Sequence, residues 1–186
     1  TLWHTLSLHD ALPIWRIVFV PGNHDWGYGA PGVERQENFV DDYLKRDYDV
    51  FVPENACSEP EVIELNDHLV VVAIDSEWFL HDWEKEPKIN DGCEIKSRRE
   101  FMLYFEEAIK KNRRKNIIVA MHHPLHTYGT HGGHYTFQQH LFPLLDLKDN
   151  LWLPLPIIGS GINFLRSTVG TRQDVSHPLY KDMRDE

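Results

Sequence analysis

Two short apolar runs in this chain each end directly in a loop that carries histidine. Residues 15–20 (WRIVFV) precede Gly-Asn-His-Asp at 22–25, and residues 116–121 (NIIVAM) precede His-His-Pro at 122–124. Short runs rich in β-branched residues are typical of strands buried in a sheet. In an open α/β sheet, ligands bind where loops leave the carboxyl ends of such strands. The pattern therefore predicts a sheet whose strand ends bring both histidine loops to one crevice.

The rest of the chain alternates between helical and strand patterns. The spacing of apolar residues predicts helices over 34–46, after the capping-box residue Ser97, and over 135–145. Two strand-like runs, 62–65 and 68–74, are joined by an Asn-Asp pair that is typical of a hairpin turn. Strands that alternate with helices predict an α/β fold with helices on both faces of the sheet.

The composition excludes some classes of function. The chain has 186 residues, about one domain, and a net charge of −10 from 19 Lys and Arg against 29 Asp and Glu. We expect no nucleic-acid-binding surface, because phosphate backbones favour positive proteins. The chain contains no run of 18 or more uncharged apolar residues, so its sequence shows no obvious membrane span. The two cysteines, Cys57 and Cys93, are compatible with one disulfide or with two free thiols.

Both ends of the chain have unusual sequences. Residues 1–14 show neither strand nor helix periodicity, and residues 5–14 (TLSLHDALPI) can be encoded by the tail of a common sequencing adapter. We expect 1–14 to be a foreign segment that packs little; a disordered native terminus is the alternative. A helical pattern that begins at Ser176 stops at Glu186. We therefore expect residues 15–186 to be an internal fragment of a longer protein.

The tetrapeptide after the first apolar run combines residue types that suit metal-assisted proton chemistry. Gly22 permits a sharp turn, and Asn23 offers an amide oxygen to a divalent metal. His24 offers an imidazole for proton transfer, and Asp25 could fix the tautomer of that imidazole. An ordinary Gly-Asn turn with incidental histidines is the alternative interpretation.

The second histidine loop has two adjacent candidates. His122 is the stronger candidate for a metal ligand, and His123 the weaker, because neighbouring side chains on an extended segment point in opposite directions. Most single histidines in proteins are structural or merely exposed. The pair gains weight because it follows a predicted strand, as Gly-Asn-His-Asp does.

In these motifs the chain resembles the calcineurin-like metallophosphoesterases, and among them most closely the purple, tartrate-resistant-type acid phosphatases. The resemblance rests on residues 22–25 and 121–124, and on the order and spacing of 74–76 and 130–134. It covers about residues 15–147. It implies a partial metallophosphoesterase β-sandwich, in which mixed sheets are flanked by helices, incomplete at both ends.

The resemblance also implies a reaction and a set of roles. Asn23 and His122 would bind the same metal in a centre of two ions, for which Fe, Mn or Zn suits the mixed nitrogen and oxygen ligands. His24 would donate a proton to the leaving group, with Asp25 behind it, and the substrate would be a phosphoester. The implied substrate-side contacts are His131 and, more weakly, His123.

Several family motifs are missing from this sequence. No Asp-x-His or Gly-Asp motif precedes Gly22, and no Gly-His-x-His motif occurs before Glu186. We therefore expect the parent protein to be a metal-dependent phosphatase or phosphodiesterase, while this chain alone is inactive. The alternatives are an inactive metal- or phosphate-binding domain of the same fold and a structural domain with incidental histidines.

A strongly apolar stretch interrupted by Pro and Gly follows the resembling region. We expect residues 147–175 to be an insertion that either packs on its own domain or contacts a membrane surface or a partner through 151–167. The apolar insertion and the acid-phosphatase likeness favour the cell envelope over other compartments.

Overall fold

The computed structural model describes residues 17–146 and 148–185 and divides them into two compact units. The first unit contains residues 17–78 and 83–122, and the second contains 79–82 and the residues from 123 onward. The segment 1–14, predicted to be foreign, lies outside the described residues, so that interpretation stays a prediction.

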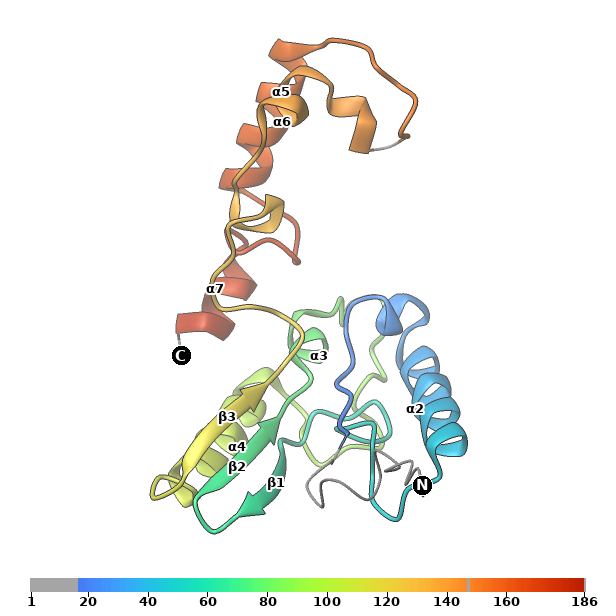
Figure 1. The fold of residues 1–186 in the computed structure, drawn as a ribbon, viewed down its shortest axis with the longest axis vertical. Coiled ribbons are helices and arrows are strands. Elements are labelled where there is room, and N and C mark those ends of the chain that lie inside the picture. The colour runs from blue at the N-terminus through green and yellow to red at the C-terminus, as the bar shows by residue number, and fades with distance from the viewer. Residues whose placement is uncertain (1–16, 147, 186) are drawn as a thin grey trace, which may run out of the picture. The chain divides into compact units, whose positions relative to one another are not determined.

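A three-stranded mixed sheet lies at one side of the first unit (Figure 1). Strands β1 (Glu61–Asn66) and β2 (Leu69–Ala73) are antiparallel, and β3 (Asn116–Ala120) runs parallel to β2. The Asn66 side chain accepts a hydrogen bond of 2.8 Å from the backbone N–H of His68, which stabilises the turn between β1 and β2. The predicted hairpin and α/β class are confirmed, whereas the second sheet of a sandwich is not found in the described residues and stays a prediction.

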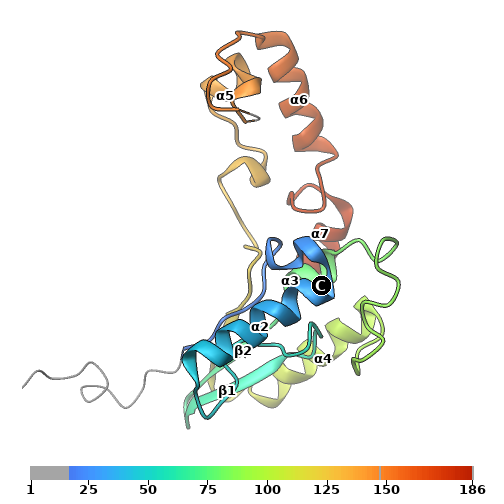
Figure 2. The same cartoon turned by 90° about the vertical axis from the view of Figure 1, so that its right-hand side faces the viewer.

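Helix α4 (Arg98–Lys111) lies along one face of this sheet (Figures 1 and 2). It begins where predicted, because the Ser97 side chain accepts a hydrogen bond of 3.2 Å from the Glu100 backbone N–H. Ala108 of α4 and Val62 of β1 line the same hollow, which places this strand face toward the helix.

The opposite face of the sheet packs against extended segments. Ile63 and Ala73 form a buried cluster with Val52, and Val18 and Val20 pack against it. Helices were expected on both faces of the sheet. Helix α4 covers one face, whereas extended chain packs next to the other.

Residues 17–20 of the first predicted strand are described, and they form only a single β-bridge. Phe19 pairs in parallel with Phe51, through bonds from the Phe19 N–H to the Val50 oxygen (2.7 Å) and from the Val52 N–H to the Phe19 oxygen (2.9 Å). The next residue, Pro53, has no N–H and cannot extend the ladder. The prediction of a full strand is therefore wrong for residues 17–20.

Strand β3 forms as predicted, but it is not buried. The side chains of Ile118 and Val119 are 50% and 39% exposed. The strand order places β3 at an edge, with β2 as its neighbour among the described strands, so one side of the ladder lacks a covering strand there. Sequence alone marks a residue as apolar but does not report the position of its strand in a sheet.

Helices and 3₁₀ turns complete the two units. The structure contains η1 (Asp25–Tyr28), α2 (Ala30–Leu44), α3 (Ser76–Leu80), η2 (Thr130–Gly132), α5 (Phe137–Leu141), η3 (Pro143–Asp146), α6 (Pro156–Thr168) and α7 (Pro178–Asp185). Helix α2 begins before the expected residue 34, because a proline fits its first turn. The helix expected over 135–145 is divided into α5 and η3, since Pro143 cannot continue an α-helix. Within 17–146 and 148–185, none of the helices has both the length and the apolar character that a bilayer crossing requires.

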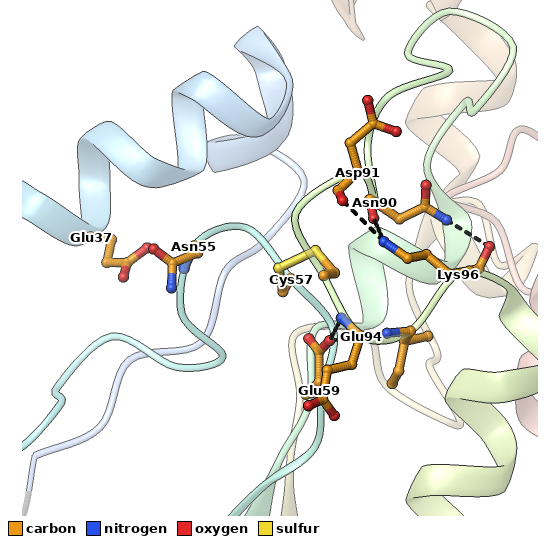
Figure 3. The surroundings of a disulfide bond; sticks show 10 residues. Glu37, Asn55, Cys57, Glu59, Asn90, Asp91, Glu94 and Lys96 are labelled. Carbon is orange, nitrogen blue, oxygen red and sulfur yellow. Dashed lines mark hydrogen bonds between the residues drawn. A yellow bond between two sulfur atoms is a disulfide. The ribbon is translucent and has the colours of Figure 1, made fainter.

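A disulfide joins Cys57 to Cys93 and resolves the alternative left open by the sequence (Figure 3). It ties the loop before β1 to the loop before α4. Next to it, the Glu59 carboxylate accepts hydrogen bonds from the backbone N–H groups of Glu94 and Ile95. The bridge and this carboxylate together fix the loop that leads into α4.

Candidate functional site

The two histidine loops of the sequence analysis meet at Gly22 and His122. A Cβ atom added to Gly22 would lie 2.6 Å from His122 Nδ1 and 2.8 Å from His122 Cε1. The imidazole therefore lies directly against the backbone of Gly22, and only glycine leaves room for it. Asn23, the next residue, is on a loop adjacent to His122, as two ligands of one metal require.

The Gly-Asn-His-Asp segment is a turn closed by its own hydrogen bonds. The backbone N–H groups of Asp25 and Trp26 donate to the Gly22 oxygen at 3.0 and 3.2 Å. The Asp25 carboxylate accepts a bond of 2.8 Å from the Gly22 N–H. Asp25 thus stabilises the turn, and across the described residues the exposed His24 ring makes no hydrogen bond to it. The tautomer-fixing role expected for Asp25 has no support in this geometry, whereas His24 faces solvent.

A buried carboxylate anchors the residue that follows this turn. The Trp26 indole N–H donates a bond of 2.8 Å to Asp75, and the Trp78 backbone N–H donates one of 3.0 Å to the other Asp75 oxygen. Burial raises the pKa of Asp75 to about 7, although the bonds from Trp78 and Trp26 lower it. No role was expected for Asp75 from the sequence. Asp75 lies two residues after the end of β2, in the same place relative to a strand as the two histidine loops, and this position could have indicated it.

His123 has the environment of a structural histidine. Its side chain is buried, its Nε2 lies 2.6 Å from Gln173 Oε1, and its ring meets Tyr180 edge-on at 5.8 Å. It belongs to the second unit, whereas His122 belongs to the first. Its predicted contact with substrate stays a prediction, and the burial favours a role in packing.

His131 is held by a carboxylate that sequence reasoning missed. Its Nδ1 lies 2.8 Å from Asp174 Oδ1, and its side chain is half exposed while that of Asp174 is buried. Arg166 Nε donates to Asp174 at 3.2 Å, and the Thr171 backbone and hydroxyl donate at 2.7 and 2.8 Å. Burial alone would raise the pKa of Asp174, but the hydrogen bonds outweigh it and the pKa is lowered. The contact joins residues 43 positions apart, which no local pattern reveals.

The donor set at the meeting point of the two loops suits a transition metal. An amide oxygen from Asn23 and an imidazole nitrogen from His122 are ligands that Mn, Fe and Zn accept, and His122 lies against Gly22, the residue before Asn23 in the chain. Elsewhere in the described part of the chain, the one trio of His, Cys, Asp or Glu with ligand spacing is Cys57, Glu59 and Cys93. Its two sulfurs form the disulfide and are not metal ligands.

Comparison with known proteins agrees with these motifs. The sequence profile of the calcineurin-like phosphoesterases matches residues 4–153, most of the chain, including both histidine loops. Neither a curated protein nor a solved structure matches the chain. Members of the matched family are in general metal-dependent hydrolases of phosphoesters. The chain belongs to the calcineurin-like phosphoesterase family.

Proposed function

We propose that this chain supplies part of the active site of a phosphatase or phosphodiesterase with a centre of two metal ions, Fe, Mn or Zn. The observation that carries the proposal is the fit of His122 against Gly22, which brings its imidazole beside the loop of Asn23. Metal ions bound there would polarise the phosphoryl oxygens of a phosphoester and activate water. In this proposal the purple acid phosphatases are the nearest branch of the family.

The residues of the Gly-Asn-His-Asp turn have separate tasks in this proposal. Asn23 presents its amide oxygen to the metal shared with His122. His24, exposed and free of a bond to Asp25, donates a proton to the leaving oxygen. Asp25 holds the turn closed through the Gly22 N–H, and Asp75 holds its continuation through the Trp26 indole. On the second unit, the His131 imidazole presented by Asp174 is the proposed substrate-side contact.

Asn23 and His122 alone make an incomplete two-metal site. A two-metal centre requires a bridging carboxylate and further histidines, and the matching family motifs are missing from the sequence. We therefore propose that the complete gene product contributes the remaining ligands and that the 186-residue chain is inactive alone. An inactive metal- or phosphate-binding domain of the same fold is the alternative.

The test is hydrolysis of p-nitrophenyl phosphate and bis(p-nitrophenyl) phosphate with Mn²⁺ by the complete gene product. His24→Ala should lower kcat by about 10²–10⁴-fold while the bound metal content stays unchanged. His68→Ala in the exposed hairpin turn is the matched control and should leave kcat unchanged. Turnover by the 186-residue chain alone would contradict the proposal that metal ligands are missing from it. A wild-type kcat in His24→Ala would contradict the proposal that His24 is the proton donor.

Helix α6 supports a second proposal, contact with a bilayer surface. Its outward stripe, Ile158, Ile162 and Leu165, is 50–62% exposed and carries no charge. Trp152, 60% exposed, precedes the helix, and tryptophan is favoured at membrane interfaces. Since a structural disulfide is typical of oxidising compartments, we propose the cell envelope as the location of this chain.

A further inference from the structure

The disulfide between Cys57 and Cys93 lies beside the carboxylate of Glu59 (Figure 3). Each of these three residues offers one ligand atom, and the three atoms lie within 4.8 Å of one another. Two thiolates and a carboxylate form a ligand set that zinc accepts at about 2.0–2.3 Å. In the oxidised chain the two sulfurs bind each other, so a metal could use them only after reduction of the bridge.

The loop that carries Cys57 is held by contacts that do not depend on the disulfide. The backbone N–H of Asn55 donates a 2.7 Å hydrogen bond to the Glu37 carboxylate on α2 (Figure 3). The backbone N–H of Cys57 donates one of 3.0 Å to the Glu54 oxygen. We therefore expect this loop to stay in place when the bridge is reduced.

The loop that carries Cys93 is closed by hydrogen bonds of its own (Figure 3). Lys96 Nζ donates to the backbone oxygens of Asn90 and Asp91 at 2.7 and 3.0 Å, and Asn90 Nδ2 donates to the Lys96 oxygen at 2.6 Å. With both loops held, the two cysteines should stay near their Cα separation of 5.4 Å. From there the two sulfurs can adopt the separation of about 3.8 Å that two thiolates on one tetrahedral zinc ion require.

Glu59 is already oriented by its surroundings. Its Oε1 accepts hydrogen bonds from the backbone N–H groups of Glu94 and Ile95, whereas its Oε2 accepts none from the described part of the chain. Hydrogen bonds of this kind hold the carboxylate ligands of metal sites in position. They leave the second oxygen of Glu59 available to a cation.

The surroundings of this trio favour a divalent cation. Both cysteines and Glu59 line a hollow of about 400 Å³, through which a small reductant can reach the bridge. The other acidic residues of the hollow are Glu54, Glu61 and Glu94, and none of its described lining residues is Lys, Arg or His. Such a concentration of negative charge attracts cations. Thiolate ligands select zinc over magnesium, calcium and manganese.

We propose that the reduced chain binds one zinc ion through Cys57, Cys93 and Glu59, with water as the fourth ligand, and that oxidation replaces this ion by the disulfide. Two external thiols reduce the bridge and leave as a disulfide of their own, which produces two Cys–SH groups. Zinc binding then releases both thiol protons, because the thiolate is the ligand. The site uses no residue assigned to phosphoester hydrolysis, so it stands or falls separately from the proposed hydrolase.

The experiment adds Co²⁺ to the 186-residue chain after reduction with a phosphine, which becomes a phosphine oxide and contributes no thiol ligand. Thiolate ligation to Co²⁺ gives a near-ultraviolet charge-transfer band that nitrogen and oxygen ligands do not give. The band therefore reports this site separately from Asn23 and His122. The reduced wild type should show the band and Zn²⁺ should displace it, whereas the oxidised wild type should not show it.

Glu59→Gln separates metal binding from loop stabilisation, since the glutamine oxygen can still accept the bonds from Glu94 and Ile95. It should raise the Kd for Zn²⁺, measured by displacement of Co²⁺, by about 10–100-fold. The double variant Cys57→Ser/Cys93→Ser should lack the band. Glu64→Gln, at an exposed position on β1, is the matched control and should bind as the reduced wild type does.

Three results would overturn the proposal. One is the absence of the charge-transfer band from the reduced wild type. Another is a zinc content no higher in the reduced chain than in the oxidised chain. The third is wild-type zinc affinity in Glu59→Gln, which would exclude the carboxylate as a ligand. If the reduced chain unfolds without metal, as judged by circular dichroism, Zn²⁺ should restore its fold, and failure to do so would also contradict the proposal.

Discussion

The Trp26 indole N–H donates a 2.8 Å hydrogen bond to the fully buried carboxylate of Asp75. The two residues are 49 positions apart, and their contact joins the turn after Gly-Asn-His-Asp to the end of β2. A buried carboxyl group at this place makes the stability of the site region depend on pH.

Asp75→Asn should remove part of the pH dependence of stability. The unfolded Asp75 ionises near 3.8, but the folded residue keeps its proton until its pKa of about 7. Between these values the folded state binds more protons, so the free energy of unfolding falls as pH rises and becomes level above about pH 7. Asn cannot ionise, so the stability of Asp75→Asn relative to that of the wild type should rise by about 3 kcal/mol between pH 5 and pH 8.

Urea unfolding at several pH values checks this expectation. Asp67→Asn in the exposed hairpin turn is the matched control, and its curve should run parallel to that of the wild type. A parallel curve for Asp75→Asn would show that Asp75 ionises normally in the folded chain.

Gly22→Ala should displace His122 without unfolding the chain. The added methyl would lie 2.6 Å from the imidazole, so the ring must leave its position against residue 22. A ligand held out of position typically costs about 10–100-fold in metal affinity. Gly27→Ala is the control, since no atom lies within 4 Å of its Cβ position. Equal Mn²⁺ affinity of the two variants in isothermal titration would exclude His122 as a ligand.

The disulfide should contribute strongly to stability. Its sequence separation of 36 residues predicts about 3–4 kcal/mol from the restriction of the unfolded chain. The double variant Cys57→Ala/Cys93→Ala should lose this free energy of unfolding in urea. Dithiothreitol should lower the stability of the wild type equally and leave the double variant unchanged. A wild type indifferent to dithiothreitol would argue that the bridge carries no stability.

The outward face of α6 should bind vesicles. The wild-type chain should float with vesicles of phosphatidylcholine and phosphatidylglycerol, because each apolar side chain removed from water contributes about 1.5–3 kcal/mol. Replacement of Ile158, Ile162 and Leu165 by serine should abolish flotation, whereas Ser160→Ala on the opposite face of the helix should not affect it. Flotation that survives the triple substitution would place the contact elsewhere.

Local patterns predicted the elements whose determinants are local. The Asn-Asp turn predicted the hairpin, and Ser97 with Glu100 predicted the start of α4, because turns and caps depend on residues a few positions apart. The exposure of Ile118 was not predictable, since it depends on which strands lie beside β3.

The partners of the site residues escaped prediction for a similar reason. Asp75 contacts Trp26 and Asp174 contacts His131 across more than 40 positions, and only the fold brings them together. Helix α6 was not predicted, because Pro156, Gly159 and Gly161 interrupt the helical pattern in the sequence. In the structure the proline occupies the first turn, and Gly159 allows close packing on α5.

Mn²⁺ binding by the 186-residue chain, followed through the free-ion signal in electron paramagnetic resonance, tests the shared metal site most directly. Asn23→Ala and His122→Ala should each weaken binding of one ion, and the double variant should lose little more than either single one, because both residues hold the same ion. His126→Ala, an exposed histidine four residues beyond His122, should bind as wild type does. Wild-type binding in both single variants, or losses that add fully in the double variant, would contradict a metal shared by Asn23 and His122.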